Sequence, residues 1–438
     1  MFTLSSSCPK STALRYLHRN PGSEPCAITP PSNLPIKNSN QSRCSYSIHP
    51  PANQSVAAIV FGDGSTHSRL HPLTKRRSEA AIPVAGNYRL IDAVVSNCIN
   101  SDVTRIYALT QFNSTSLNSH LSRAYSGMRL SNDGIVEVIA AYQSPDNNGW
   151  FRGTADAIRR CLWMLEEYPV AEFLVLPGHH LYKMDYRNLV EAHRRSGCDI
   201  TVSVSTRTKG DDRKEDMGIY VIDRDVMIEL LTIHFPNAND LGSEVIPGAT
   251  SLGMKIHTYE FDGYWEDMAS IVAYYRANME AIPRMSNAYN FYDKEWPLYT
   301  LPRHLPPTLI TDAVITDSIV GDGCILNKCR ITSSVIGMRT RIGNDAVVED
   351  SIIIGSDAYY PNNNGSGEDR GAGIPVGIGE GSYIRKAIVD KNARIGNNVM
   401  IVNKDGVEEG SDESRGCIIS GGVIVITRNA LIPHGTIL

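Results

Sequence analysis

The stretch Ala57-Ala-Ile-Val-Phe-Gly-Asp-Gly-Ser-Thr-His-Ser-Arg69 opens the part of this 438-residue chain that has the pattern of a folded domain. A short apolar run ends in Gly62, Gly64 and small polar residues, and an arginine follows. Glycine lets backbone N–H groups converge, and Arg69 offers charge-assisted donors, so the composition is typical of a phosphate-binding loop after a strand. Because most glycine-rich turns are only turns, this prediction needs support from the rest of the chain.

From Val56 to about residue 282, apolar runs alternate with helical patterns. The alternation predicts an α/β domain with a largely parallel sheet covered on both faces. The expected strands are Val56–Phe61, Thr104–Leu109, Ile135–Ala140, Glu172–Leu176, Asp199–Ser205 and Gly218–Ile222. The expected helices are Leu90–Asn100, Ser114–Ala124, Thr154–Glu167, Arg187–Ser196, Val226–Phe235 and Ala269–Glu280. Site loops lie at the carboxyl ends of such strands, which singles out the glycine-rich loop and Gly178-His179-His180.

A second periodicity begins after residue 307. Ile or Val recurs in a loose six-residue rhythm and is often followed by glycine, as in Val320-Gly321, Ile336-Gly337, Ile342-Gly343, Ile354-Gly355, Ile378-Gly379 and Ile395-Gly396. One inward aliphatic residue per six, with Gly or Asn at the corners, predicts a parallel β-helix over residues 308–438. Independent antiparallel strands would not keep this rhythm. We expect residues 283–307 to be an interdomain linker and 361–373 to be a loop.

The remaining composition limits the function. Hydrophobic residues make up 42% of the chain and the net charge is −5, with no long apolar run, so neither nucleic-acid binding nor a membrane span is expected. Nine cysteines without a CxxC pair favour a reducing compartment. Residues 1–55 are rich in Ser, Pro and Asn and carry several bases against the single acid Glu24. This leader is typical of an organelle transit peptide, and a disordered tail is the alternative.

Hexapeptide β-helices occur commonly in acyltransferases and in sugar nucleotidyltransferases, and the first domain decides between them. Its motifs, and one in the β-helix, are Ala57–Asp92, Leu109-Thr-Gln-Phe-Asn-Ser114, Gly153-Thr-Ala-Asp156, Gly242-Ser-Glu-Val-Ile-Pro-Gly248, Asp262-Gly-Tyr-Trp-Glu-Asp267 and Val389-Asp-Lys-Asn-Ala-Arg-Ile-Gly396. With these motifs the chain resembles plant ADP-glucose pyrophosphorylase of the small-subunit type. The resemblance implies a Rossmann-like nucleotidyltransferase domain followed by a left-handed β-helix. It also implies ATP and glucose 1-phosphate as substrates, Mg²⁺, a plastid location, and large subunits as partners in a heterotetramer.

The resemblance also identifies two Mg²⁺-binding carboxylates, of which this chain keeps one. Asp267 stands in the Trp-Glu-Asp motif, but the Asp of the family's Gly-Asp-His motif is replaced by His179. Imidazole is a poor ligand for a hard cation that prefers oxygen. We therefore expect loss of the metal site, with recruitment of a different metal by His179 as the alternative.

Two further departures add acids to the expected phosphate site. Asp63 interrupts the family's run of glycines, and Glu79 stands where the family has a lysine that reaches the phosphates. Both carboxylates should repel a polyanion unless Glu79 is a solvated surface acid. Residues 206–216 are also shorter than the family's sugar-phosphate region and lack its Glu-Lys-Pro motif; a gene-model error would leave the same gap.

Other family positions are retained. Those implied to bind the nucleotide, besides the glycine-rich loop, are Gln111, Gly153 and Trp163, although Trp163 could equally be a core aromatic. Those implied to bind the anionic effectors 3-phosphoglycerate or phosphate are Arg77, Arg89, Lys391 and Arg428, with Arg428 replacing a lysine. The sequence therefore predicts a catalytically impaired subunit that acts in assembly and regulation. The alternative is an active glucose-1-phosphate adenylyltransferase, and an acyltransferase is a distant third.

Overall fold

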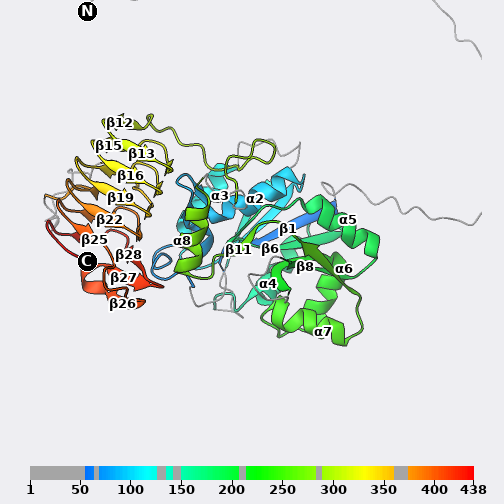
Figure 1. Cartoon of the computed structure of the whole chain (residues 1–438). Coiled ribbons are helices and arrows are strands. Elements are labelled where there is room, and N and C mark those ends of the chain that lie inside the picture. Colours follow the sequence, from blue (N-terminus) through cyan, green and yellow to red (C-terminus); the bar gives the residue numbers. More distant parts are fainter. Residues whose placement is uncertain are drawn as a thin grey trace, which may run out of the picture. The chain divides into compact units, whose positions relative to one another are not determined.

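The computed structural model describes residues 55–63, 69–125, 135–141, 149–206, 214–282, 289–359 and 373–438 (Figure 1). The predicted leader lies outside these residues except for Ser55, and so do Gly64, residues 207–213 of the shortened region and the insert up to residue 372. The account that follows concerns the unit Pro50–Leu438.

A seven-stranded sheet organises the first domain. Its order is β10-β8-β9-β6-β1-β4-β5, formed by β1 (Val56–Phe61), β4 (Arg105–Thr110), β5 (Ile135–Ala140), β6 (Glu172–Pro177), β8 (Ile200–Ser205), β9 (Glu215–Asp223) and β10 (Ile256–Phe261). Only β9, among the strands of this sheet, runs antiparallel to its neighbours. Every residue of β1 is buried, as expected for a strand covered on both faces. The largely parallel α/β sheet is confirmed, with strand ends within three residues of those predicted.

Helices cover both faces of the sheet because successive residues of a strand point to opposite sides. Ala58 and Val60 pack with α2 (Leu90–Asn100), α3 (Thr115–Ala124) and α5 (Tyr186–Ser196). Ala57 and Ile59 pack with α4 (Thr154–Leu165) and α6 (Arg224–Glu229). The predicted helix Val226–Phe235 is instead α6 followed by a π-helical turn, Leu230–His234. The predicted helix Ala269–Glu280 is α8 (Ile271–Glu280), since the Ser270 side chain accepts from the Ala273 N–H and caps its start.

The C-terminal domain is a β-helix of short strands stacked in three sheets (Figure 1). Equivalent strands of successive coils pair in parallel, except for the antiparallel β26–β27–β28 at one end. The strands of the three sheets are β12 (Leu309–Thr311), β15 (Ile325–Asn327), β18 (Arg341–Ile342), β21 (Gly377–Ile378), β24 (Arg394–Ile395) and β29 (Leu431–Ile432); β13 (Val314–Thr316), β16 (Arg330–Thr332), β19 (Val347–Glu349), β22 (Tyr383–Arg385) and β25 (Met400–Ile401); and β14 (Ile319–Val320), β17 (Val335–Ile336), β20 (Ile352–Ile353), β23 (Ala387–Val389), β28 (Val423–Ile426), β27 (Cys417–Ser420) and β26 (Glu409–Asp412).

The glycines that follow the repeated aliphatic residues have a different role in these coils from the corner role predicted for glycine. The glycines after the repeated aliphatic residues mostly lack positive φ and instead allow one coil to lie on the next. A Cβ on Gly337 would lie 2.2 Å from the Ile354 carbonyl oxygen, and one on Gly379 would lie 2.4 Å from the Gly396 carbonyl oxygen. The left-handed corners are held in part by glycines and asparagines, as predicted, among them Gly323, Gly381, Asn392 and Asn398, and in part by residues that the rhythm did not predict, among them Asp312, Asp317, Lys328, Asp345 and Asp350. Asp and Asn tolerate this conformation better than most residues, which explains the exchange at those positions.

The two domains share an apolar core. Tyr274 of α8 and Leu90 of α2 belong to the same buried cluster as Ile352 and Ile388 of the β-helix. The predicted linker contributes buried Tyr289 and Phe291 to this cluster. Its side chains therefore pack into the fold.

The six cysteines of the described residues are free, and all but Cys198 are buried. In that part of the chain, no helix combines the length and apolar character that crossing a bilayer requires.

Candidate functional site

A cavity of about 530 Å³ lies at the carboxyl ends of β1, β4 and β6. This is where site loops of an open α/β sheet are expected. Predicted residues from five separate parts of the sequence line it: Asp63 and Arg69, Gln111, Gly153, His179, and Asp267. Asp216, Tyr220, Asp240 and Glu244 also line it, so the cavity carries more acids than the sequence argument considered.

Gly62 and Asp63 are the first residues of the glycine-rich loop and the part of it that the structure describes. The Gly62 N–H donates to the Leu109 carbonyl at 2.8 Å, and a Cβ on Gly62 would lie 2.7 Å from Leu117 Cδ2. Gly62 is thus required by close packing. Burial raises the pKa of Asp63 to about 7, and the nearby Glu79 adds to the rise, although the Glu79 backbone N–H donates to Asp63 Oδ1 at 3.3 Å. The other carboxylate oxygen of Asp63 is buried and has no hydrogen-bond partner among the described residues.

Glu79 is not a solvated surface acid. Glu79 lies in the short 3₁₀ helix Glu79–Ala81 and is 4% exposed. Its Oε1 accepts a hydrogen bond from the Arg69 backbone N–H at 3.2 Å. The alternative of a harmless exposed carboxylate is therefore wrong. Glu79 is thus hydrogen-bonded to the backbone of Arg69, a residue that lines the cavity.

His179, His180 and Asp267 form a compact triad. His180 belongs to β7 (His180–Tyr182), which pairs antiparallel with β11 (Trp265–Asp267), so that Asp267 lies opposite His180. Asp267 Oδ1 lies 3.8 Å from His179 Nε2 and 3.3 Å from His180 Nε2. Each side chain offers a ligand atom, and these three atoms lie within 4.8 Å of one another. Arg69 Nη1 contacts the other oxygen, Asp267 Oδ2, at 2.9 Å.

The protonation states within the triad follow from burial and from the neighbouring charges. Burial and the adjacent His180 lower the pKa of His179 to about 3, against the opposing attraction of Asp267. Burial disfavours ionised Asp267, but the contact with His180 and the charge of Arg69 outweigh it and lower the pKa of Asp267. At neutral pH the triad thus contains a neutral His179 and an ionised Asp267. One carboxylate with two imidazoles does not fit Mg²⁺, because Mg²⁺ prefers oxygen ligands and usually keeps several of its water molecules when it binds.

The predicted nucleotide positions separate into two groups. Gln111, just after β4, lines the cavity, and its Oε1 is buried with no hydrogen-bond partner in the part of the chain that the structure describes. Gly153 also lines the cavity, and a Cβ there would lie 2.4 Å from the Asn239 carbonyl oxygen. Trp163 lies on α4 with 61% of its surface exposed and is not among the described residues that line the cavity. The core-aromatic alternative for Trp163 is therefore wrong as well.

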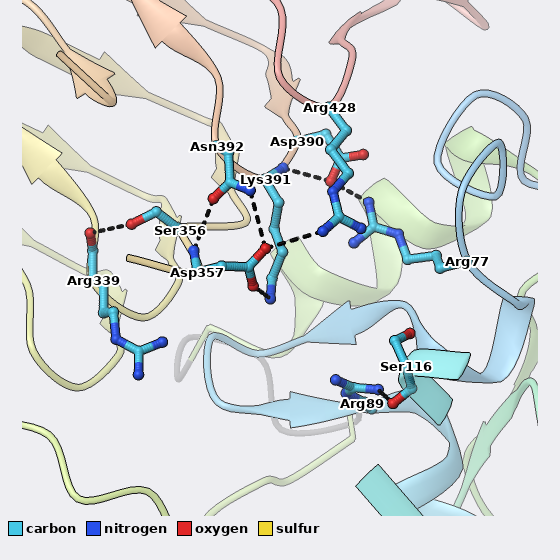
Figure 2. Close-up of polar contacts among 10 residues, drawn as sticks. All are labelled: Arg77, Arg89, Ser116, Arg339, Ser356, Asp357, Asp390, Lys391, Asn392 and Arg428. Atoms are coloured by element: carbon cyan, nitrogen blue, oxygen red, sulfur yellow. Dashed lines mark hydrogen bonds and ion pairs between the residues drawn. The ribbon is translucent and has the colours of Figure 1, made fainter. Parts of the chain in front are cut away.

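The four basic residues predicted to bind effectors, here called the basic cluster, are Arg77, Arg89, Lys391 and Arg428. Figure 2 shows carboxylates among them. Lys391 Nζ and Arg428 Nη2 both contact Asp357, at 2.6 and 3.0 Å, and Asn392 Nδ2 donates to it at 3.0 Å (Figure 2). Burial disfavours the charge on Asp357, but Lys391 and Arg428 hold its pKa far below the ordinary value.

Arg77 and Arg89 are held differently. The Arg77 guanidinium pairs with buried Asp390 of the β-helix and also donates to the Leu73 carbonyl at 2.8 Å (Figure 2). The Arg89 guanidinium donates to the Ser116 carbonyl at 2.8 Å, and burial lowers its pKa to about 10 despite the nearby Asp92. The cluster therefore consists of one buried ion pair, one partly desolvated arginine and two cations that share Asp357.

The sequence argument placed His180 in a site loop but gave it no role, and it missed the roles of Asp357 and Asp390. His180 and Asp390 stand next to the predicted site residues His179 and Lys391. Adjacency in sequence, however, does not show which way a side chain points. The antiparallel pairing of β7 and β11 brings His180 to Asp267. Asp357 stands just before the undescribed insert, and only the stacking of the coils brings it to Lys391.

Comparison with known proteins agrees with this architecture. Residues 57–214 match the family model described as nucleotidyl transferase, and residues 303–437 match that of the GLGC left-handed parallel beta-helix domain. The fold and the cavity thus define a nucleotidyltransferase domain joined to a left-handed β-helix. Nucleotidyltransferases of this kind generally use a divalent metal.

Two full-length relatives narrow the class. The chain is 56% identical, over 90% of its length and 91% of the relative's, to the inactive glucose-1-phosphate adenylyltransferase small subunit 2, chloroplastic, of Arabidopsis thaliana. It is 44% identical, over 89% of its length and 93% of the relative's, to the glucose-1-phosphate adenylyltransferase small subunit, chloroplastic/amyloplastic, of Triticum aestivum. The chain belongs to the glucose-1-phosphate adenylyltransferase (ADP-glucose pyrophosphorylase) small-subunit family.

Proposed function

We propose that this chain is a plastid subunit of ADP-glucose pyrophosphorylase whose own catalysis is impaired, and that it acts in assembly and regulation. The observation that carries the proposal is His179 at the end of β6, in the cavity and facing Asp267. Family chemistry transfers the adenylyl group of ATP to glucose 1-phosphate, and Mg²⁺ between two carboxylates would neutralise the phosphate oxygens. With an imidazole in place of one carboxylate, that neutralisation is lost.

The acids around the glycine-rich loop support the same conclusion. Asp63 lines the cavity, and Glu79 is buried directly behind Arg69. Each replaces a neutral or basic group of the resembled family where a triphosphate would lie, so ATP meets added negative charge there. The relative in Arabidopsis thaliana, itself named inactive, is consistent with this proposal. The plastid address rests on the names of both relatives and on the composition of residues 1–55.

The alternative, an active glucose-1-phosphate adenylyltransferase, has its own support. Gln111, Gly153 and Asp267 remain around a cavity of about 530 Å³. The relative in Triticum aestivum carries the name of the transferase without the word inactive. Mg²⁺ in this case would be held by Asp267 and by the phosphates of the substrate.

Regulation is proposed through the basic cluster and through partner subunits. Lys391 and Arg428 present two cations to one carboxylate, a charge arrangement that suits 3-phosphoglycerate or phosphate once Asp357 is displaced. Large subunits of the same family are the proposed partners, in a heterotetramer. The charge of Asp357 means that an effector competes with an internal anion.

The deciding experiment measures ADP-glucose formation from ATP and glucose 1-phosphate by the chain alone and by the chain with a large subunit. We expect little turnover by the chain alone, and a changed effector response of the large subunit in the mixture. The variant His179→Asp/Glu79→Lys, with Asp63→Gly added, should raise turnover of the chain. Turnover by the unaltered chain alone at the rate of an active small subunit measured side by side would overturn the proposal and establish the alternative.

A further inference from the structure

The triad does more than lack an Mg²⁺ ligand. His179, His180 and Asp267 place three side chains with metal-ligating atoms around one point of the cavity wall. The separations of 3.3 and 3.8 Å from Asp267 Oδ1 to the two Nε2 atoms are close to the edge of a zinc tetrahedron, about 3.3 Å for bonds of about 2.0 Å. Two imidazoles and one carboxylate are also the protein ligands of several zinc enzymes and of non-haem iron sites.

The Asp267 carboxylate is turned toward the two imidazoles. Its Oδ1 is buried and lies 3.3 Å from His180 Nε2 and 3.8 Å from His179 Nε2. Arg69 does not occupy this oxygen, because its guanidinium contacts Oδ2. That contact instead fixes the carboxylate with Oδ1 turned toward the histidines.

From this geometry we infer that His179, His180 and Asp267 bind a borderline divalent transition-metal ion, with zinc as its representative. The fourth coordination position faces the cavity, where water or an anionic oxygen completes the tetrahedron. The inference does not depend on whether the chain forms ADP-glucose, since it concerns only which cation the site holds. The replacement of the family's Asp by His179 would then exchange one metal for another.

One contact must change when the ion binds. The Trp265 indole N–H donates to His180 Nδ1 at 3.3 Å, which places the ring proton on Nε2 in the metal-free chain. Binding through Nε2 requires that proton to move to Nδ1, and the indole bond is lost. At 3.3 Å this bond is long and weak, so its loss opposes metal binding only slightly.

The test is zinc binding to the full chain without a histidine tag, after dialysis against a chelator. Isothermal titration with Zn²⁺ and visible absorption with Co²⁺ report binding without any activity assay. We expect about one ion per chain, with at least tenfold weaker binding in His179→Gln and Asp267→Asn and loss of the Co²⁺ bands. His234→Gln removes an exposed histidine paired with Glu229 and should bind like the unaltered chain. Thermal melting in chelator checks that each variant folds.

A metal exchange supplies the second arm. His179→Asp should bind Zn²⁺ more weakly than the unaltered chain and bind Mn²⁺ more tightly, because it restores an oxygen ligand at the same place. Zn²⁺ binding that is undiminished in both His179→Gln and Asp267→Asn would overturn the inference, since the ion would then lie elsewhere. Absence of saturable Zn²⁺ binding to the unaltered chain would overturn it equally.

Discussion

The buried pair Arg77–Asp390 predicts that one proposed effector residue is mainly structural. Arg77 stands in the first domain and Asp390 in the β-helix, and their side chains are 4% and 2% exposed. Removal of either partner leaves an uncompensated buried charge, which typically costs about 3–5 kcal/mol. Arg77→Met also leaves the Leu73 carbonyl without its guanidinium donor, whereas Asp390→Asn keeps the shape of the site and loses only the charge.

The assay is urea unfolding of the two single variants and the double variant Arg77→Met/Asp390→Leu, followed by fluorescence and by far-UV circular dichroism. We expect each single variant to lose about 3 kcal/mol or more and the double variant to recover part of that loss, because apolar pairs often replace buried ion pairs without penalty. Phosphate affinity should change little in the double variant. Single-variant losses below about 0.5 kcal/mol, the scale of ordinary surface substitutions, would refute the reasoning.

Three further outcomes follow from the same geometry. Asp357→Asn should tighten the binding of inorganic phosphate about tenfold, since a close charge pair is worth roughly 1 kcal/mol or more. Calorimetry measures this affinity, with Asp350→Asn as the control variant of another acid. Equal phosphate affinities of the two variants would count against the prediction. Burial raises the pKa of Asp63 to about 7 from 3.8, so the folded chain binds the extra proton and its stability falls as pH rises through that window. Asp63→Asn should thus be more stable than the unaltered chain at pH 8 and lose this advantage toward pH 4, as urea midpoints would show; parallel curves would contradict the assignment. Gly337→Ala should lose about 1–3 kcal/mol by overpacking, because its Cβ would lie 2.2 Å from a carbonyl of the next coil, whereas Gly149→Ala, with open space around the Cβ, should melt with the unaltered chain.

Most of the fold followed from periodicity. Apolar runs and helical stripes located the strands and helices within a few residues, because burial of β1 on both faces leaves a continuous apolar signature. The six-residue rhythm located the β-helix for the same reason. The pattern predicted only the Gly and Asn corners and missed the others, since the rhythm records which side chains point inward but not which backbone turns left. Asp312 and Lys328 take such corners without any glycine signal.

The site was less accessible to sequence reasoning because its parts meet only in three dimensions. His179 and Asp267 were predicted from their motifs, but His180 joins them through the pairing of β7 with β11. The basic cluster was predicted from its charges alone, and the acids Asp357 and Asp390 change what those charges do. Sequence patterns locate charged residues more readily than the partners that neutralise them.

Glu79 and Asp63 are best understood as one change in two places. The Glu79 backbone N–H donates to Asp63, the Glu79 carboxylate raises the pKa of Asp63, and Glu79 Oε1 accepts from the Arg69 backbone. A lysine introduced at position 79 would therefore form an ion pair with the Asp63 carboxylate. That ion pair would neutralise the added positive charge, so the lysine would attract the phosphates of ATP less. Restoring phosphate binding consequently requires Asp63→Gly together with Glu79→Lys. If Glu79→Lys alone restores ATP binding as well as the pair does, the two acids act separately, and the loop is a weaker barrier to catalysis than the triad.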